Sequence, residues 1–156
     1  MSFSIIACVG KNNELGNKGG LVFHIKEDMK FFRTTTKGHK VVMGRKTWES
    51  LPGKLKDREN IVISSEPVAE ADQTVSNLEA YIKDNIDSSE EIFIIGGGSI
   101  YSQFLPYAKN LYLTEVNASP DADIFFPRFD KKRYHRKTLQ TGEQGDLTYK
   151  IIKYSK

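Results

Sequence analysis

The sequence predicts one α/β domain, residues 1–156, with a mixed, mostly parallel central sheet flanked by helices and a C-terminal antiparallel hairpin. Its 156 residues are close to the ~150 of a single compact domain. Short runs rich in Val and Ile alternate with helical patterns as far as Pro106. Beyond Pro106 the apolar runs follow one another without a helical pattern between them, which favours antiparallel pairing at the end of the chain.

Each expected element follows from its local pattern. Buried strands, which are short, β-branched and followed by Gly or Ser, are expected at Phe3 to Val9, Lys40 to Met43, Asn60 to Ile63 and Ile92 to Ile95. Helices are expected at Asp28 to Thr35, Lys46 to Leu51, Leu78 to Ile86 behind the cap Asn77, and Ser99 to Leu105. The closing strands are expected at Leu111 to Val116, Arg133 to Thr141 and Leu147 to Tyr154. Ligands should lie at the carboxyl ends of the parallel strands.

Composition excludes several classes of protein. Apolar residues make up 38% of the chain and aromatic residues 11%, which excludes general disorder. Cys8 is the only cysteine, so an internal disulfide and a thiolate zinc site are excluded, and the three histidines are too scattered to predict a metal site. No uncharged stretch is long enough to cross a bilayer, and the N-terminus lacks a signal-peptide pattern. We expect a cytoplasmic monomer with no metal and no membrane partner.

Charge is distributed unevenly along the chain. Residues 1–58 hold 12 Lys and Arg against 5 Asp and Glu, residues 59–127 hold 2 against 12, and residues 128–156 hold 9 against 3. A basic first third suggests an anionic ligand, and clustered solvated faces explain the pattern equally well. The basic residues are dispersed among apolar strands without a nucleic-acid-binding motif, so no nucleic-acid partner is expected. The basic segment 128–137 has no assigned role.

Asp28 is the strongest single candidate for a catalytic or ligand-binding residue. At helical spacing it shares a face with Ile25, Phe31 and Phe32, so its carboxylate points toward apolar surroundings. Burial disfavours the ionised form unless a cationic or hydrogen-bonding partner is present, and a ligand is a natural partner. The alternative is an acidic residue in the first helical turn, stabilised by the helix dipole by ~0.3–1 kcal/mol.

Two strand-to-helix turns have the composition of phosphate sites. Gly96, Gly97 and Gly98 permit close approach of a ligand to the backbone and precede Ser99, although a tight turn alone also requires glycine. Gly44 is followed by two cations and a hydroxyl, and Ser64 and Ser65 end the next strand. Parallel strands would bring these turns to one edge. The combination favours a dinucleotide that carries an extra phosphate over a merely solvated surface.

The segment from Gly10 to Val22 is a long connection with three further glycines among polar residues. Long glycine-bearing loops of this kind often act as lids over an active site. An ordinary flexible surface loop is the alternative.

Taken together, these segments resemble the dihydrofolate reductase family, in its bacterial form, over nearly the whole chain. No single motif carries the resemblance, which rests on the order and spacing of many. The matching residues are Ile6-Ala7, Leu15-Gly16, Asp28 with Phe32, Val42 to Ser50, Arg58, Asn60 to Ser65, Ile95 to Gly98, Tyr101 and Leu113-Thr114.

The resemblance implies NADPH-dependent reduction of 7,8-dihydrofolate to tetrahydrofolate, with hydride transfer to C6 and protonation of N5. Asp28, assisted by Thr114, would hold the pterin and promote the protonation, with Leu21 and Phe23 completing the catalytic group. Substrate would also contact Ile6, Phe32, Leu51, Ile95 and, through the α-carboxylate of its glutamate tail, Arg58. Cofactor would contact Ala7, Cys8, Leu15, Gly16, Gly44, Arg45, Lys46, Thr47, Ser64, Ser65, Ile95, Gly96, Gly97, Gly98, Ser99, Ile100 and Tyr101.

Within the cofactor group the resemblance implies distinct tasks. The backbones of Cys8 and Leu15 would hold the nicotinamide carboxamide, and Arg45 and Lys46 would face the adenosine phosphates. Ser65 would lie near the 2′-phosphate and favour NADPH over NADH.

The sequence departs from the family at the end of the lid. Val22-Phe23 stands where bacterial members carry Pro-Trp, and Ile25-Lys26 where they carry Leu-Pro. Phe23 has no indole N–H, so a water that a tryptophan would order beside the substrate must be held differently. Asp123 matches the residue that contacts the closed lid in the family.

Two other functions remain open from the sequence. A reductase of riboflavin biosynthesis would share the fold and the cofactor, although Asp28 together with Arg58 argues against it. A non-catalytic dinucleotide-binding module would require the turns and not the acid.

Overall fold

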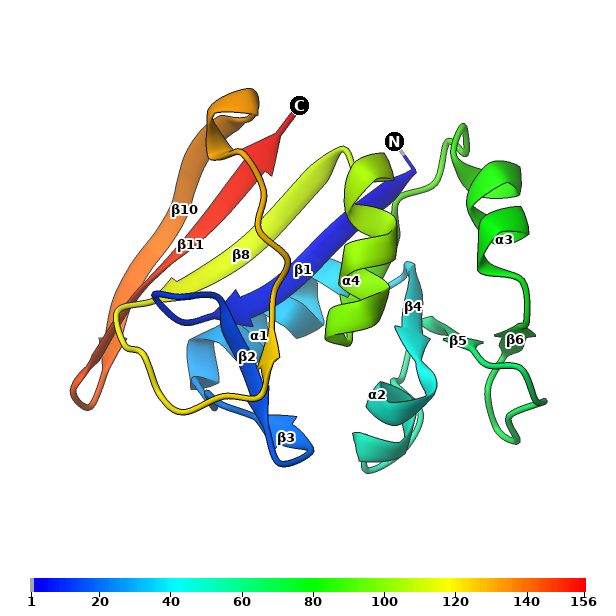
Figure 1. Ribbon diagram of the computed structural model, residues 1–156, viewed down its shortest axis with the longest axis horizontal. Helices are drawn as coiled ribbons and strands as arrows, with labels where there is room; N and C mark the ends of the chain where they lie inside the picture. The colour runs from blue at the N-terminus through cyan, green and yellow to red at the C-terminus, as the bar shows by residue number, and fades with distance from the viewer. Residues whose placement is uncertain (1) are drawn as a thin grey trace.

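The computed structural model, which describes residues 2–156, is a mixed α/β domain around an eight-stranded sheet (Figure 1). The strands lie in the order β10-β11-β8-β1-β7-β4-β5-β6. All neighbours from β8 to β6 are parallel, whereas β11 is antiparallel to both β8 and β10. The bounds are β1 Phe3–Val9, β4 Lys40–Gly44, β5 Glu59–Ile63, β6 Gln73–Val75, β7 Ile92–Gly96, β8 Asn110–Val116, β10 His135–Gln144 and β11 Leu147–Ser155. The predicted fold class is confirmed.

Helices cover both faces of this sheet, with α4 in front of it and α1 behind it in Figure 1. Side chains alternate between the faces, as the pleat requires. In β4, Val42 packs with residues of α3 and α4, whereas Val41 and Met43 pack with residues of α1 and α2. The helices are α1 Lys26–Thr36, α2 Arg45–Ser50, α3 Leu78–Asn85 and α4 Gly98–Phe104, with 3-10 turns η1 Leu105–Tyr107 and η2 Lys131–Arg133. None of these helices has both the length and the apolar character to cross a bilayer.

Some element boundaries differ from the prediction. The helix expected from Asp28 begins at Lys26, because Ile25 is an extended residue that is buried in the core. The strand expected at Arg133 to Thr141 runs from His135 to Gln144, because the tight Gly145-Asp146 turn extends its pairing with β11. Asn77 caps α3 as predicted, accepting a hydrogen bond from the Ala80 N–H at 3.0 Å.

The Gly10 to Val22 segment is more regular than the predicted loop. It contains β2 (Glu14–Asn17) and β3 (Gly20–Leu21), which form a small antiparallel sheet with β9 (Ile124–Phe125). Lys18 and Gly19 connect β2 to β3, and both have positive φ, +52° and +84°, as a type I′ hairpin turn requires. The segment expected to act as a lid, which we call the lid after that expectation, is therefore a hairpin paired with a later segment of the chain.

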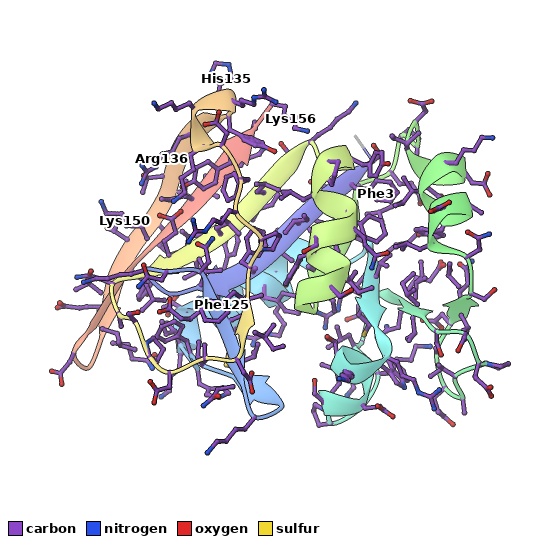
Figure 2. The ribbon with its side chains drawn as sticks, in the orientation of Figure 1. Phe3, Phe125, His135, Arg136, Lys150 and Lys156 are labelled. Atoms are coloured by element: carbon purple, nitrogen blue, oxygen red, sulfur yellow. The ribbon has the colours of Figure 1, made fainter. Side chains whose placement is uncertain are left out.

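Part of the basic segment 128–137 has a structural explanation. Lys131 and Arg136 both lie within ion-pair distance of Glu115, and Tyr154 donates its hydroxyl hydrogen bond to the same carboxylate. Both cations also approach the Tyr154 ring, at 5.7 and 6.0 Å from its centroid. Figure 2 shows Arg136 on the outer β10–β11 hairpin, where these charges fasten the edge of the sheet.

Candidate active site

The centre of the site is a hydrogen bond between Thr114 and Asp28. Asp28 lies in the first turn of α1, and Thr114 lies on β8, almost completely buried at 2% exposure. The Thr114 hydroxyl donates to Asp28 Oδ1 at 2.6 Å. Two residues that the sequence assigned to one task, 86 positions apart, are therefore in direct contact.

The environment of Asp28 disfavours its charge. Burial raises the pKa of the carboxyl above its usual range, and hydrogen bonds from Thr114 and Cys8 only partly offset that effect. The result is an acid whose proton affinity is increased without loss of its hydrogen-bonding partners. Such a group retains a proton more readily than an ordinary aspartate does, as is common for acids in active sites.

The side chains of Cys8 and Tyr101 lie near Asp28 and stay neutral, because the pKa of each is raised. Cys8 is the β1 residue paired with Thr114 across the sheet, and burial together with the Asp28 charge raises the pKa of its thiol. Tyr101 of α4 is buried, which raises the pKa of its phenol, and it donates to the Ile6 carbonyl at 2.7 Å. The Tyr101 hydroxyl thus holds the β1 backbone next to the acid.

The predicted apolar walls of the substrate site lie in one cluster. Ile6 from β1, Phe32 from α1, Leu51 after α2 and Ile95 from β7 all pack in the same hydrophobic group. Ile6 is buried, whereas the other three are only partly buried and retain surface for a ligand. The structure therefore brings together all four side chains that the sequence proposed as walls.

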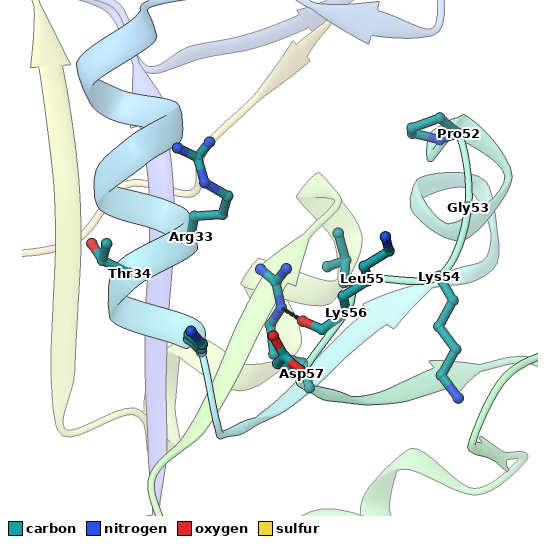
Figure 3. A pocket seen from close by; sticks show the side chains of 10 residues that line it. Arg33, Thr34, Pro52, Gly53, Lys54, Leu55, Lys56 and Asp57 are labelled. Atoms are coloured by element: carbon teal, nitrogen blue, oxygen red, sulfur yellow. Dashed lines mark hydrogen bonds between the residues drawn. The ribbon is translucent and has the colours of Figure 1, made fainter.

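Arg58 lies at the outer end of these walls and is held in a fixed orientation. Its Nε donates to the Lys56 carbonyl at 2.8 Å, the dashed line in Figure 3. Its Nη1 donates to the Thr36 hydroxyl at 3.1 Å. Its guanidinium also lies over the Phe32 ring, 5.9 Å from the centroid. These contacts leave a planar cation positioned for an anionic group of a ligand.

The glycine turns meet at one edge of the sheet, as predicted. Met43 pairs with Gly96 and Gly44 with Ile63, so the ends of β4, β5 and β7 are adjacent. A Cβ on Gly97 would lie 3.6 Å from the Thr47 hydroxyl, and the turn after β7 thus contacts the start of α2.

These turns fit a dinucleotide because their backbones approach closely and their side chains are basic or hydroxylated. A Cβ on Gly44 would lie 3.1 Å from Ile100, and a Cβ on Gly98 would lie 2.9 Å from Ile124, so larger residues would crowd these isoleucines and displace the turns. Arg45 and Lys46 are exposed at the same edge, where Arg45 makes an ion pair with Glu49 at 3.7 Å. Ser65 is exposed, whereas the buried Ser64 accepts from the Glu66 N–H.

The lid is fastened at both ends. Leu15 is buried in the main core, and Phe23 is buried against Ile25, Val116 and Tyr149. Between them Leu21 is 65% exposed. Phe23 therefore holds the C-terminal end of the lid by apolar packing, which needs no indole N–H.

Asp123 contacts the tip of the lid, as the sequence led us to expect. Its carboxylate accepts from the Lys18 N–H at 3.0 Å, and its own N–H donates to the Gly16 carbonyl at 2.9 Å. These bonds hold the hairpin turn against the loop before β9.

Two residues near the site escaped sequence reasoning. Glu14 is buried at the base of the lid, where its carboxylate accepts from the Asn12 N–H and the Ser119 hydroxyl, which lower its pKa despite the opposing effect of burial. Met29 follows Asp28 on α1 and remains 53% exposed, one turn before Phe32. The only indication for Met29 in the sequence is its position next to Asp28, and nothing local indicated that Glu14 would be buried.

Replacement of Asp28 by asparagine is expected to stabilise the fold at neutral pH. Because the folded-state pKa of Asp28 is raised, the folded state binds more protons between the unfolded and the folded pKa, and stability falls as pH rises through this window. Asp28→Asn removes the buried charge and keeps an acceptor for Thr114. Thermal unfolding at pH 7 should give a higher Tm for this variant than for wild type, with Glu27→Gln unchanged. A lower Tm for Asp28→Asn would mean that the carboxylate stabilises the fold.

Removal of the Asp123 carboxylate is expected to loosen the lid without unfolding the domain. A hydrogen bond of this kind contributes ~0.5–1.5 kcal/mol, so the Lys18 amide in Asp123→Ala should exchange with solvent roughly two- to tenfold faster. Amide hydrogen exchange measures this directly, and Asp121→Ala, which alters a neighbouring exposed carboxylate, is the control. Unchanged exchange at Lys18 would rule out Asp123 as the lid contact.

Fold and site together define an α/β enzyme with a partly buried acid, a cluster of apolar side chains and a phosphate-competent edge of the sheet. Comparison with known proteins gives the family. The dihydrofolate reductase family model matches residues 2–156. The chain is 41% identical to the dihydrofolate reductase of Neisseria meningitidis serogroup A, covering 99% of this chain and 98% of that one, and 34% identical to that of Bacillus subtilis, covering 98% and 94%. The chain belongs to the dihydrofolate reductase family.

Proposed function

We propose that this protein reduces 7,8-dihydrofolate to 5,6,7,8-tetrahydrofolate, using NADPH as the hydride donor. The observation that carries the proposal is the Thr114–Asp28 hydrogen bond, on the same helix as Phe32 of the apolar cluster, with the Arg58 guanidinium over the Phe32 ring. A pterin joined to a glutamate tail has the complementary chemistry: donor groups on the ring, an apolar middle and a carboxylate at the far end.

Asp28 binds and orients the ring. Its carboxylate accepts from the N3 and 2-amino groups of the pterin, and two charge-assisted hydrogen bonds contribute ~1.5–3 kcal/mol each. Thr114 fixes the carboxylate from the opposite side. Because its pKa is raised, Asp28 also promotes protonation of N5.

The remaining residues position the reactants and exclude water. NADPH, when bound, would supply the hydride for C6 of the pterin. Ile6, Phe32, Leu51 and Ile95 hold the substrate by apolar contact. The lid, with Leu21 near its tip, closes over the cleft, while Phe23 anchors its base.

Cofactor recognition is assigned to the edge formed by β4, β5 and β7. The backbones of Ala7, Cys8, Leu15 and Gly16 serve the nicotinamide end, and the glycine turns serve the diphosphate. Arg45 and Ser65 are both exposed and offer the cation and the hydroxyl that a 2′-phosphate needs, which supports NADPH over NADH. The full group is Ala7, Cys8, Leu15, Gly16, Gly44, Arg45, Lys46, Thr47, Ser64, Ser65, Ile95, Gly96, Gly97, Gly98, Ser99, Ile100 and Tyr101.

The test is an absorbance assay of NADPH oxidation with purified protein. Oxidation is expected only when dihydrofolate is present. The kcat/KM for NADH should be lower than the kcat/KM for NADPH. NADPH oxidation that does not depend on dihydrofolate would refute the proposal. A titration that detects NADPH binding without folate binding would favour a non-catalytic dinucleotide-binding module. We further propose that the enzyme acts as a monomer in the cytoplasm.

A further inference from the structure

The first turn of α1, which carries Asp28 as its third residue, begins without a cap from its own segment. The first N–H groups of a helix have no partner within the helix, and the first backbone bond of α1 runs from the Met29 N–H to the Ile25 carbonyl at 3.0 Å. Ile25, which precedes the helix, has an apolar side chain that is buried in the core and cannot accept a hydrogen bond. A protein partner for the Lys26 N–H must therefore come from another part of the chain.

That partner is Gln144, at the end of β10 and 118 residues later in the chain. Its Oε1 accepts from the Lys26 N–H at 2.9 Å, and its Nε2 donates to the His24 carbonyl at 3.0 Å. Because a backbone N–H can only donate and a carbonyl can only accept, these two contacts use both ends of the amide and fix its orientation. One side chain thus holds the backbone on both sides of Ile25.

Gln144 is presented to α1 from a hairpin that is itself packed against the start of this helix. It pairs with Leu147 across the turn between β10 and β11. Leu147 packs in the same apolar cluster as Ile25, together with the buried Tyr149 and Ile151 of β11. The amide therefore extends from a backbone that is fixed relative to α1.

The contact follows from the departure of this sequence from the family at the start of α1. Ile25-Lys26 stands where bacterial members carry Leu-Pro, and a proline at the first position of a helix has no N–H to satisfy. Lys26 restores that N–H, and Gln144 satisfies it. Ile25 keeps an extended backbone, φ −101° and ψ 121°, of the kind that precedes proline, so the position can still accommodate proline.

We propose that Gln144 is a positioning residue of the reductase, which holds the start of α1 so that Asp28 stays in place against Thr114 and the pterin ring. This inference rests on the proposed function, which places the pterin at Asp28. Gln144 acts through the helix and not through a contact with either ligand. Without its amide, the first turn of α1 is ordered for a smaller fraction of the time, and the affinity for a ligand that requires the ordered turn falls in proportion.

The test is the Kd of folate, measured by quenching of Trp48, the one tryptophan of the chain, in a double-mutant cycle. Gln144→Ala should raise this Kd about fivefold, the effect of losing one helix cap, whereas the Kd of NADPH should change by less than about twofold. Lys26→Pro removes the N–H and should bind folate as wild type does. In Lys26→Pro/Gln144→Ala the folate Kd should equal that of Lys26→Pro, because no N–H remains for Gln144 to satisfy.

Gln140→Ala is the matched control. Gln140 lies on the same strand, and its side chain makes no hydrogen bond with any of residues 2–156. Its folate Kd should equal that of wild type. Tm is measured for every variant, and a general loss of stability would appear as a rise in both the folate and the NADPH Kd.

The outcomes separate this inference from the proposed function. An unchanged folate Kd in Gln144→Ala, or an equal rise of the folate and NADPH Kd values, would overturn the inference and leave dihydrofolate reduction standing. An equal effect of Gln144→Ala in the wild-type and Lys26→Pro backgrounds would also overturn it, because Gln144 would then act elsewhere than at the start of α1. Failure of the wild type to bind folate would overturn the proposed function and, with it, the positioning role.

Discussion

Asp28→Asn should lower kcat with dihydrofolate by ~10²–10⁴, the range for loss of a group that assists proton transfer. The asparagine retains the shape of Asp28 and an acceptor for Thr114, and NADPH affinity should remain nearly unchanged. Without the carboxyl group, N5 must take its proton from solvent, so the residual rate of the variant should increase as pH falls. Stopped-flow measurement of hydride transfer from pH 5 to 9 tests both expectations.

Glu27→Gln is the matched control, since Glu27 is the exposed carboxylate next to Asp28 in the same helical turn. Its rates should equal those of wild type. If Asp28→Asn weakened NADPH binding as much as turnover, Asp28 would have a structural role and the proposed chemistry would be wrong.

Arg58→Leu should raise the KM for dihydrofolate by ~10²-fold, because the bidentate, charge-assisted contact with the tail carboxylate is lost. The KM for NADPH should change by less than about twofold. Arg58 also bonds to Thr36 and to the Lys56 carbonyl, so Tm is measured alongside to separate loss of fold from loss of binding.

Arg45→Leu serves as the reciprocal variant. It removes a cation from the phosphate-competent edge and should raise the KM for NADPH more than that for dihydrofolate. The reverse ranking of Arg58→Leu and Arg45→Leu would mean that the two ligands are assigned to the wrong ends of the cleft.

Local patterns were sufficient for most of the fold. The Val/Ile-rich runs and the glycine turns after them gave the core strands within one or two residues, and Asn77 capped the helix that it was expected to cap. The short strands β6 and β9 were not predicted, since Gln73–Val75 and Ile124–Phe125 have too few residues to show a period. The lid hairpin was also missed, because its regularity depends on pairing with β9, more than a hundred residues later.

The site was predictable where function requires an unusual residue at a particular spacing. Asp28 on an apolar helix face and the two glycine turns were visible in the sequence, and family resemblance joined Asp28 to Thr114. The burial of Glu14 and the repulsion between Arg33 and Arg58 were not visible, because each depends on tertiary contacts.

The most direct test of the account is transfer of deuterium from NADPH labelled at its hydride position. With dihydrofolate as substrate, the account predicts one deuterium at C6 of tetrahydrofolate for each NADPH oxidised, detected by NMR of the product. Absence of deuterium from the folate product, or NADPH oxidation without tetrahydrofolate, would contradict it.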